Sequence, residues 1–137
     1  MRSFFFVGTA VVSLVLAAGP VCAADDGFSG YYMGIDAKDG SVDSLSIVKM
    51  PDGHFKITVS SSGLAFCDDG RLPGYITATG RLDGDRLLRE NVVAKCVGSA
   101  ESFKMDDGVY IRSDDGSVLS IQAPQGRLNH YHRISNN

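Results

Sequence analysis

The stretch IVKMPDGHFKITV, residues 47–59, places an Asp-Gly pair between two runs in which apolar and polar side chains alternate. Alternation with a period of two is typical of strands with one buried face, and Asp-Gly accepts the positive φ angles that a tight hairpin turn requires. The stretch therefore predicts a β-hairpin with Asp52-Gly53 at its tip. Its second strand is expected to bury the side chains of Phe55, Ile57 and Val59.

The Asp-Gly pair occurs seven times, beginning at residues 26, 39, 52, 69, 83, 107 and 115. Oxygen-rich loops also bind calcium, but the chain has neither an EF-hand loop nor nonapeptide repeats. Pairs dispersed in this way are better explained as turns. Between them the sequence predicts nine short strands, at 30–36, 44–50, 54–61, 75–82, 86–96, 102–105, 109–112, 118–122 and 128–134.

This succession predicts an all-β fold, an antiparallel meander of about eight to nine strands. Because an open sheet has unpaired edges, closure into a small up-and-down barrel is favoured, with a two-sheet sandwich as the alternative. The segment 86–96 also fits an amphipathic helix, but the turn before it and the pair Val92-Val93 favour a strand. As a strand it would place Leu88, Glu90, Val92, Ala94 and Cys96 on one side.

Residues 1–23 have the order of a secretory signal peptide, with Arg2, an apolar run too short for a membrane span, and small residues up to Ala23. Cleavage after Ala23 predicts a secreted or periplasmic protein without a stable membrane anchor, and a single domain over residues 24–137. Loss of Arg2 would change the formal net charge from −3 to −4. Nothing in this charge indicates nucleic acid or an anionic membrane surface as a partner.

Three cysteines are present, and Cys22 would leave with the leader. The remaining pair, Cys67 and Cys96, predicts one disulfide, because small exported domains commonly carry such bridges. In the chain-entropy model a loop of this length stabilises the fold by roughly 3 to 4 kcal/mol when closed. The chain has no Cys-x-x-Cys spacing that would favour redox or metal chemistry instead.

The stretch SGYYMGID, residues 29–36, resembles the first strand of calycin-type barrels, the lipocalin and avidin-like families. Those barrels begin with Gly-x-Trp, and a basic residue of the closing strand packs across the Trp ring at the closed end. Tyr32 stands in the Trp position here, and Arg133 in LNHYHRI stands in the basic one. The resemblance implies a lipocalin-like barrel closed by a Tyr32–Arg133 pair, with a ligand cup but no particular ligand.

The more apolar face of this first strand carries Tyr31, Met33 and Ile35, which would point Tyr32 outward. We therefore expect the interior to be lined by three side chains of the strand predicted at 30–36 and three of the strand predicted at 54–61. In an eight-stranded barrel these either contact one small apolar ligand or fill a solid core. The six residues are Tyr31, Met33, Ile35, Phe55, Ile57 and Val59.

His130 and His132 project to the same face of the last strand and could ligate a metal if His54 or an Asp supplied a third ligand. The alternative is an exposed pair. The chain has no nucleophile elbow and no dinucleotide, phosphate-loop or haem motif, so no enzyme activity and no cofactor are predicted.

The sequence thus predicts an exported noncatalytic binding module of unknown specific function, whose barrel either binds a small apolar ligand or has a filled core and binds through its loops. One alternative is a protein-binding inhibitor or envelope accessory factor that uses the loops around 67–75 and 95–103. The other is a metal-binding protein, or a weak metal-dependent catalyst, built on His130 and His132.

Overall fold

The computed structural model describes residues 26–37, 39–122 and 128–136, so the predicted leader lies outside the described part. Within that part the chain forms nine strands and no helix, and therefore no helix long and apolar enough to cross a membrane. The strand ends lie within two residues of the predicted ones, and 86–96 is a strand. The strands are β1 Gly30–Ile35, β2 Val42–Lys49, β3 Phe55–Ser61, β4 Gly74–Asp83, β5 Arg86–Cys96, β6 Ser102–Lys104, β7 Gly108–Arg112, β8 Val118–Gln122 and β9 Leu128–Ser135.

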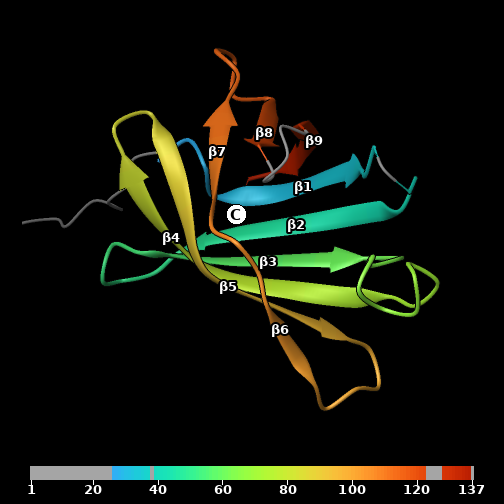
Figure 1. The fold of residues 1–137 in the computed structure, drawn as a ribbon. Helices are drawn as coiled ribbons and strands as arrows, with labels where there is room; N and C mark the ends of the chain where they lie inside the picture. The colour runs from blue at the N-terminus through green and yellow to red at the C-terminus, as the bar shows by residue number, and fades with distance from the viewer. Residues whose placement is uncertain (1–25, 38, 123–127, 137) are drawn as a thin grey trace, which may run out of the picture.

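The strands form one closed antiparallel sheet, as Figure 1 shows. Closure comes from the pairing of β1 with β9 and of β4 with β5, which confirms the barrel over the sandwich. β6 and β7 pair with β5 in a single register and act as one wall strand interrupted at residues 105–107. The result is an eight-stranded up-and-down barrel with one extra strand segment, compatible with a calycin-like fold.

The Asp-Gly pairs largely form turns, as predicted. Six of their seven glycines have positive φ angles, among them Gly53 at the β2–β3 tip. There the amide of Met50 donates to the carbonyl of His54, with 2.8 Å between nitrogen and oxygen. The exception is Gly108, which lies in β7 without a left-handed φ angle and faces the barrel interior. Gly108 is the cross-strand partner of Arg89, a residue of the cavity described in the next section.

The half of the barrel near the β2–β3 and β4–β5 turns has a filled interior. Phe55 and Ile57 point inward and are buried, as predicted. Large apolar side chains from all around the wall meet them there, so this half is a solid hydrophobic core. The main members are Leu45, Ile47, Phe55, Ile57, Leu87, Leu119 and Tyr110.

The predicted inward orientation of Tyr31, Met33 and Ile35 was wrong, because these side chains are 51%, 45% and 67% exposed. Tyr32 points inward instead, on the same face as Gly34. A Cβ atom on Gly34 would lie 3.0 Å from the Tyr131 ring and closer still to the backbone of β9. The inner face of β1 thus consists of small residues and one aromatic ring, since it must leave room for the neighbouring ring of β9.

Tyr32 and Arg133 close the filled end. They are cross-strand partners in the β1–β9 pairing, and the Arg133 guanidinium carbon lies 5.1 Å from the centre of the Tyr32 ring. The Tyr32 hydroxyl donates to the Phe28 carbonyl at 2.7 Å, and Arg133 Nη2 donates to the Gly27 carbonyl and to the Tyr32 hydroxyl, each at 2.6 Å. Phe28, which is 2% exposed, plugs the barrel beneath this pair.

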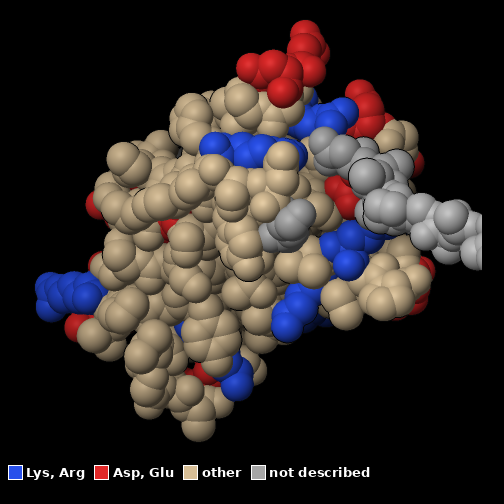
Figure 2. All heavy atoms as spheres, turned by 180° about the vertical axis from the view of Figure 1, so that it is seen from behind, with Lys and Arg blue, Asp and Glu red and all other residues tan. Residues whose placement is uncertain are grey.

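Charged side chains of both signs are scattered over the face of the molecule seen in Figure 2, and neither sign covers a continuous area there. The face seen in Figure 2 therefore offers no continuous positive track for a polyanion.

Candidate functional site: a cavity at the open end of the barrel

The barrel is hollow at the end formed by the β1–β2 and β3–β4 connections, where a cavity of about 590 Å³ opens. This volume lies in the range of small-molecule sites, roughly 300–1,000 Å³. Among the six residues predicted to line a ligand site, Val59 lines this cavity, whereas Phe55 and Ile57 belong to the filled core. Further lining residues include Asp36, Asp43, Ser61, Leu64, Phe66, Ile76, Arg89, Met105, Ile121, Asn129 and Tyr131.

The loop between β3 and β4 forms part of the mouth. Leu64 and Phe66 of this loop line the cavity, and Phe66 stacks on Phe103 with 6.2 Å between ring centres. Cys67 and Cys96 lie at disulfide distance, 2.03 Å between sulfur atoms, as the sequence predicted. The disulfide therefore joins this loop to the end of β5, beside the aromatic pair.

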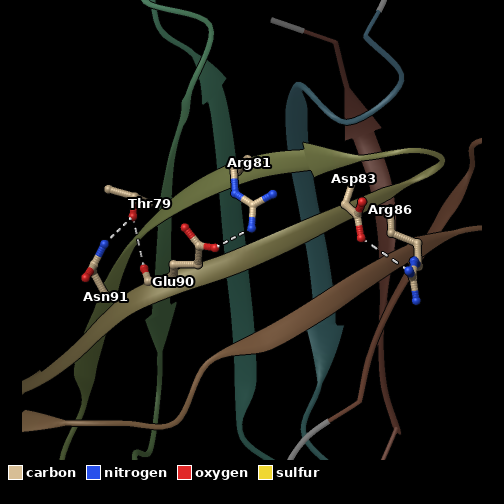
Figure 3. A network of polar contacts seen from close by, with 6 residues as sticks. All are labelled: Thr79, Arg81, Asp83, Arg86, Glu90 and Asn91. Carbon is tan, nitrogen blue, oxygen red and sulfur yellow. Dashed lines mark hydrogen bonds and ion pairs between the residues drawn. The ribbon is translucent and has the colours of Figure 1, made fainter.

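A bulge in β5 determines which of its side chains enter the cavity. Thr77 pairs with Val93 but Thr79 pairs with Glu90, so β5 carries one residue more than β4 at this point. Asn91 occupies the bulge with φ of 55°, a left-handed conformation that asparagine tolerates better than most residues. Figure 3 shows that its side-chain amide donates to the Thr79 hydroxyl, at 3.0 Å, on the outer surface.

The extra residue reverses the alternation of β5. Val92 and Ala94 share the inner face after the bulge, but before it the inward residues are Leu87 and Arg89, so the predicted common face with Leu88 and Glu90 does not continue through the strand. Glu90 lies on the outside, where it pairs with Arg81 at 2.9 Å (Figure 3). Exposed pairs of this kind contribute little to stability. The bulge thus brings one arginine into the barrel.

Arg89 is 8% exposed and lines the cavity. Its Nη2 donates to the carbonyl of Asp106 in a long hydrogen bond of 3.4 Å, and its buried Nε has no hydrogen-bond partner among the described residues. No carboxylate in the described part of the chain lies within 4 Å of the guanidinium. Among the residues that the structure describes, this buried guanidinium thus has no counter-ion.

An acidic group occupies the β1–β2 side of the cavity. Asp43 is 6% exposed, its Oδ2 accepts a hydrogen bond from the Tyr131 hydroxyl at 3.2 Å, and its Oδ1 has no partner among the described residues. Burial raises the pKa of the Asp43 carboxyl, and the negative charges of Asp36 and Asp39 act in the same direction. Asp36 in turn accepts a hydrogen bond from Asn129 at 2.9 Å.

Two tyrosines lie between the cation and the acids. Tyr110 and Tyr131 meet edge to face, with 6.5 Å between ring centres. Burial raises the pKa of both hydroxyls well above the ordinary value, so both stay protonated at neutral pH. The buried Tyr110 hydroxyl faces the Arg89 guanidinium, whose charge and hydrogen bonding lower the Tyr110 pKa but are outweighed by burial. The floor of the cavity is thus polar, whereas part of its wall is apolar.

The other predicted site residues lie elsewhere. His130 and His132 project outward from β9 and are exposed, and Nδ1 of His130 lies 2.8 Å from the Ser120 hydroxyl. His54 lies beside the β2–β3 turn, at the filled end. In the described ranges no three His, Cys, Asp or Glu residues are placed to share a metal ion. The structure thus brings no third ligand to the histidine pair.

Comparison with known proteins adds no assignment, since no family model, curated protein or solved structure matches the chain. The sequence reasoning missed Arg89, Asp43 and Tyr131 as cavity residues. If the alternation of β5 continued without a bulge, Arg89 would point outward. The feature of the sequence that indicates the bulge is Asn91, an asparagine in the middle of a strand.

Proposed function

We propose that the protein is an exported, noncatalytic binding protein that holds one small amphipathic molecule in the cavity at the open end of the barrel. The observation that carries this proposal is a cavity of about 590 Å³ lined by Asp43 and Arg89, whose buried Oδ1 and Nε atoms have no hydrogen-bond partner among the described residues. Buried polar atoms are normally hydrogen-bonded, so their presence beside a hollow favours a bound ligand. Likeness to calycin-type barrels, which the fold permits, is part of the proposal.

Several features support the remaining parts of the proposal. The Cys67–Cys96 bond suits an oxidising compartment, in line with a cleaved leader and a secreted or periplasmic location. The cavity combines carboxylates, hydroxyls and one guanidinium with apolar side chains such as Ile76 and Ile121. This mixture matches the usual composition of small-molecule sites, in which a few polar groups orient an apolar ligand.

The test is binding of a neutral fluorescent probe, N-phenyl-naphthylamine, to the oxidised protein. Ile76→Trp fills the cavity from β4 and is expected to lower the affinity at least tenfold. Thr77→Trp is the matched control, since Thr77 is the next residue and points outward. Val59→Phe is a second cavity-filling variant, should Ile76→Trp fold poorly. Absence of probe binding to the wild type, or equal binding to both tryptophan variants, would contradict the proposal.

Protein binding through the mouth is a second candidate. Phe66, Leu72 and Val97 are 53%, 46% and 58% exposed, and they lie on the two connections that the disulfide joins. Apolar side chains on braced loops are typical of inhibitors and accessory factors. A Leu72→Ser, Val97→Ser variant, changed at two exposed residues outside the cavity lining, is expected to keep probe binding and lose the protein partner if this candidate is correct. If that variant still bound the protein partner, the result would contradict protein binding through the mouth.

A further inference from the structure

Arg89 gives the cavity a charged subsite. A guanidinium keeps its charge at any physiological pH, and burial of a charge is costly unless an opposite charge or several hydrogen bonds compensate. Arg89 is 8% exposed, its hydrogen bond to the Asp106 carbonyl, at 3.4 Å, is long, and the Tyr110 hydroxyl beside it is neutral. Its Nε is buried and has no hydrogen-bond partner among the described residues.

The protein leaves space around this side chain. Gly108 is the cross-strand partner of Arg89, and a Cβ atom there would lie 3.4 Å from both Nε and Nη2 of the guanidinium. Met105 and Ile121 line the cavity beside Arg89, and the aromatic ring of Phe66 lies at the mouth. A group held by Arg89 would therefore continue into apolar surroundings.

The acids lie on the opposite wall. Eight strands follow one another around the wall, so strands four positions apart lie on opposite sides of the barrel. β1 and β5 are such a pair, and so are β2 and β7. Asp36 and Asp43 thus face the Arg89–Gly108 wall across the barrel, and neither lies within ion-pair distance of Arg89. The cavity has a positive wall and an acidic wall, so an anionic group has one favourable position in it.

We propose that the ligand is a small organic anion, with a carboxylate or sulfonate group on the Arg89 guanidinium and an apolar body directed towards Phe66. The inference rests on the proposed function, because it specifies the chemistry of the molecule that occupies the cavity. Planar guanidinium groups suit such anions, since two parallel N–H groups can bind two oxygens at once.

The test uses two probes that share one apolar body. Anilinonaphthalene sulfonate carries an anionic group, whereas N-phenyl-naphthylamine lacks it. Wild-type protein is expected to bind the sulfonate at least tenfold more tightly than the neutral probe. Arg89→Met should remove this preference and leave the affinity for the neutral probe within twofold, while Arg89→Lys should retain part of it. Arg86→Met is the matched control, because Arg86 lies on the same strand, is exposed and faces outward.

A second measurement needs no variant. A medium-chain carboxylate should displace the neutral probe from wild-type protein at least tenfold more effectively than the alcohol of the same chain length. Equal displacement by both, or unchanged sulfonate binding in Arg89→Met, would overturn the anion proposal while the binding function stands. Failure of both probes to bind wild-type protein would overturn the binding function itself, and the anion proposal with it.

Discussion

Arg89 of β5 and Gly108 of β7 are cross-strand partners, and the guanidinium lies over a position where any side chain would touch it. Gly108→Val should therefore displace the guanidinium from its place beside the cavity. We expect the affinity for the sulfonate probe to fall about tenfold, equivalent to about 1.4 kcal/mol, with little change for the neutral probe. Equal losses for both probes in fluorescence titrations would show a general distortion of the cavity instead.

Asp43 should make stability depend on pH. Burial raises the pKa of the Asp43 carboxyl in the folded protein above its ordinary value of 3.8, so the folded protein binds this proton more tightly than the unfolded chain does. The stabilising contribution is complete below pH 3.8 and is lost as the pH rises through the higher folded pKa.

Asp43→Asn removes this titration and keeps an acceptor for the Tyr131 hydroxyl. The variant should be more stable than wild type at pH 7, and the difference should shrink as the pH approaches 3.8. Urea unfolding of both proteins at a series of pH values measures it. A difference that stays constant with pH would contradict the expectation.

Tyr32→Phe should destabilise the closed end by about 1 to 3 kcal/mol, because the Phe28 carbonyl loses its donor and the Arg133 guanidinium loses one of its acceptors. The ring stays, so the stacking of Arg133 on it is kept. Tyr31→Phe is the control, since its side chain is exposed and should change stability by less than about 0.5 kcal/mol. Equal unfolding midpoints in urea for the two variants would contradict this account.

Asn91 should tolerate glycine but not a β-branched residue, because its φ of 55° is left-handed. Asn91→Val is expected to cost about 1 to 3 kcal/mol, whereas Asn91→Gly should stay within about 0.5 kcal/mol of wild type. Chemical unfolding distinguishes the two. A valine variant as stable as the glycine one would mean that β5 adopts another backbone path at this point.

The Cys67–Cys96 bond should contribute roughly 3 to 4 kcal/mol to the free energy of unfolding. Unfolding of the double variant Cys67→Ala, Cys96→Ala, compared with oxidised wild type, measures this contribution. Reduced wild type serves as the control for the loss of the side chains themselves. An unchanged midpoint in both would show that the unfolded chain gains little freedom from the open loop.

Alternation and turn chemistry were sufficient to predict the strands and the closed barrel. Phe55 and Ile57 face inward as their alternation indicates, because β3 runs regularly through the core. The phase of β1 was not predictable from hydrophobicity, since its inner positions must be small enough for the Tyr131 ring. Side chains such as Tyr31 and Met33 are left outside in consequence.

The polar cavity was not predicted because its residues come from distant strands and because one of them depends on a backbone irregularity. Asp43 looks like an ordinary turn-associated acid in the sequence, and its burial follows only from the register of β2 against β1 and β3. Arg89 looks like an outer residue until the extra residue at position 91 is counted. Periodicity shows that successive side chains point to opposite sides of a strand. A bulge exchanges the inner and outer side from that point on, and the amino-acid composition does not reveal it.

The pairing of the sheet also limits how another protein can recognise this one. Among the described strands, every one but β6 has a partner on both sides. β6 offers an open edge of three residues, Ser102–Lys104, and it ends in a lysine, a residue that discourages strand addition. Within the described strands, a partner that extends β-sheets would therefore find no edge of useful length.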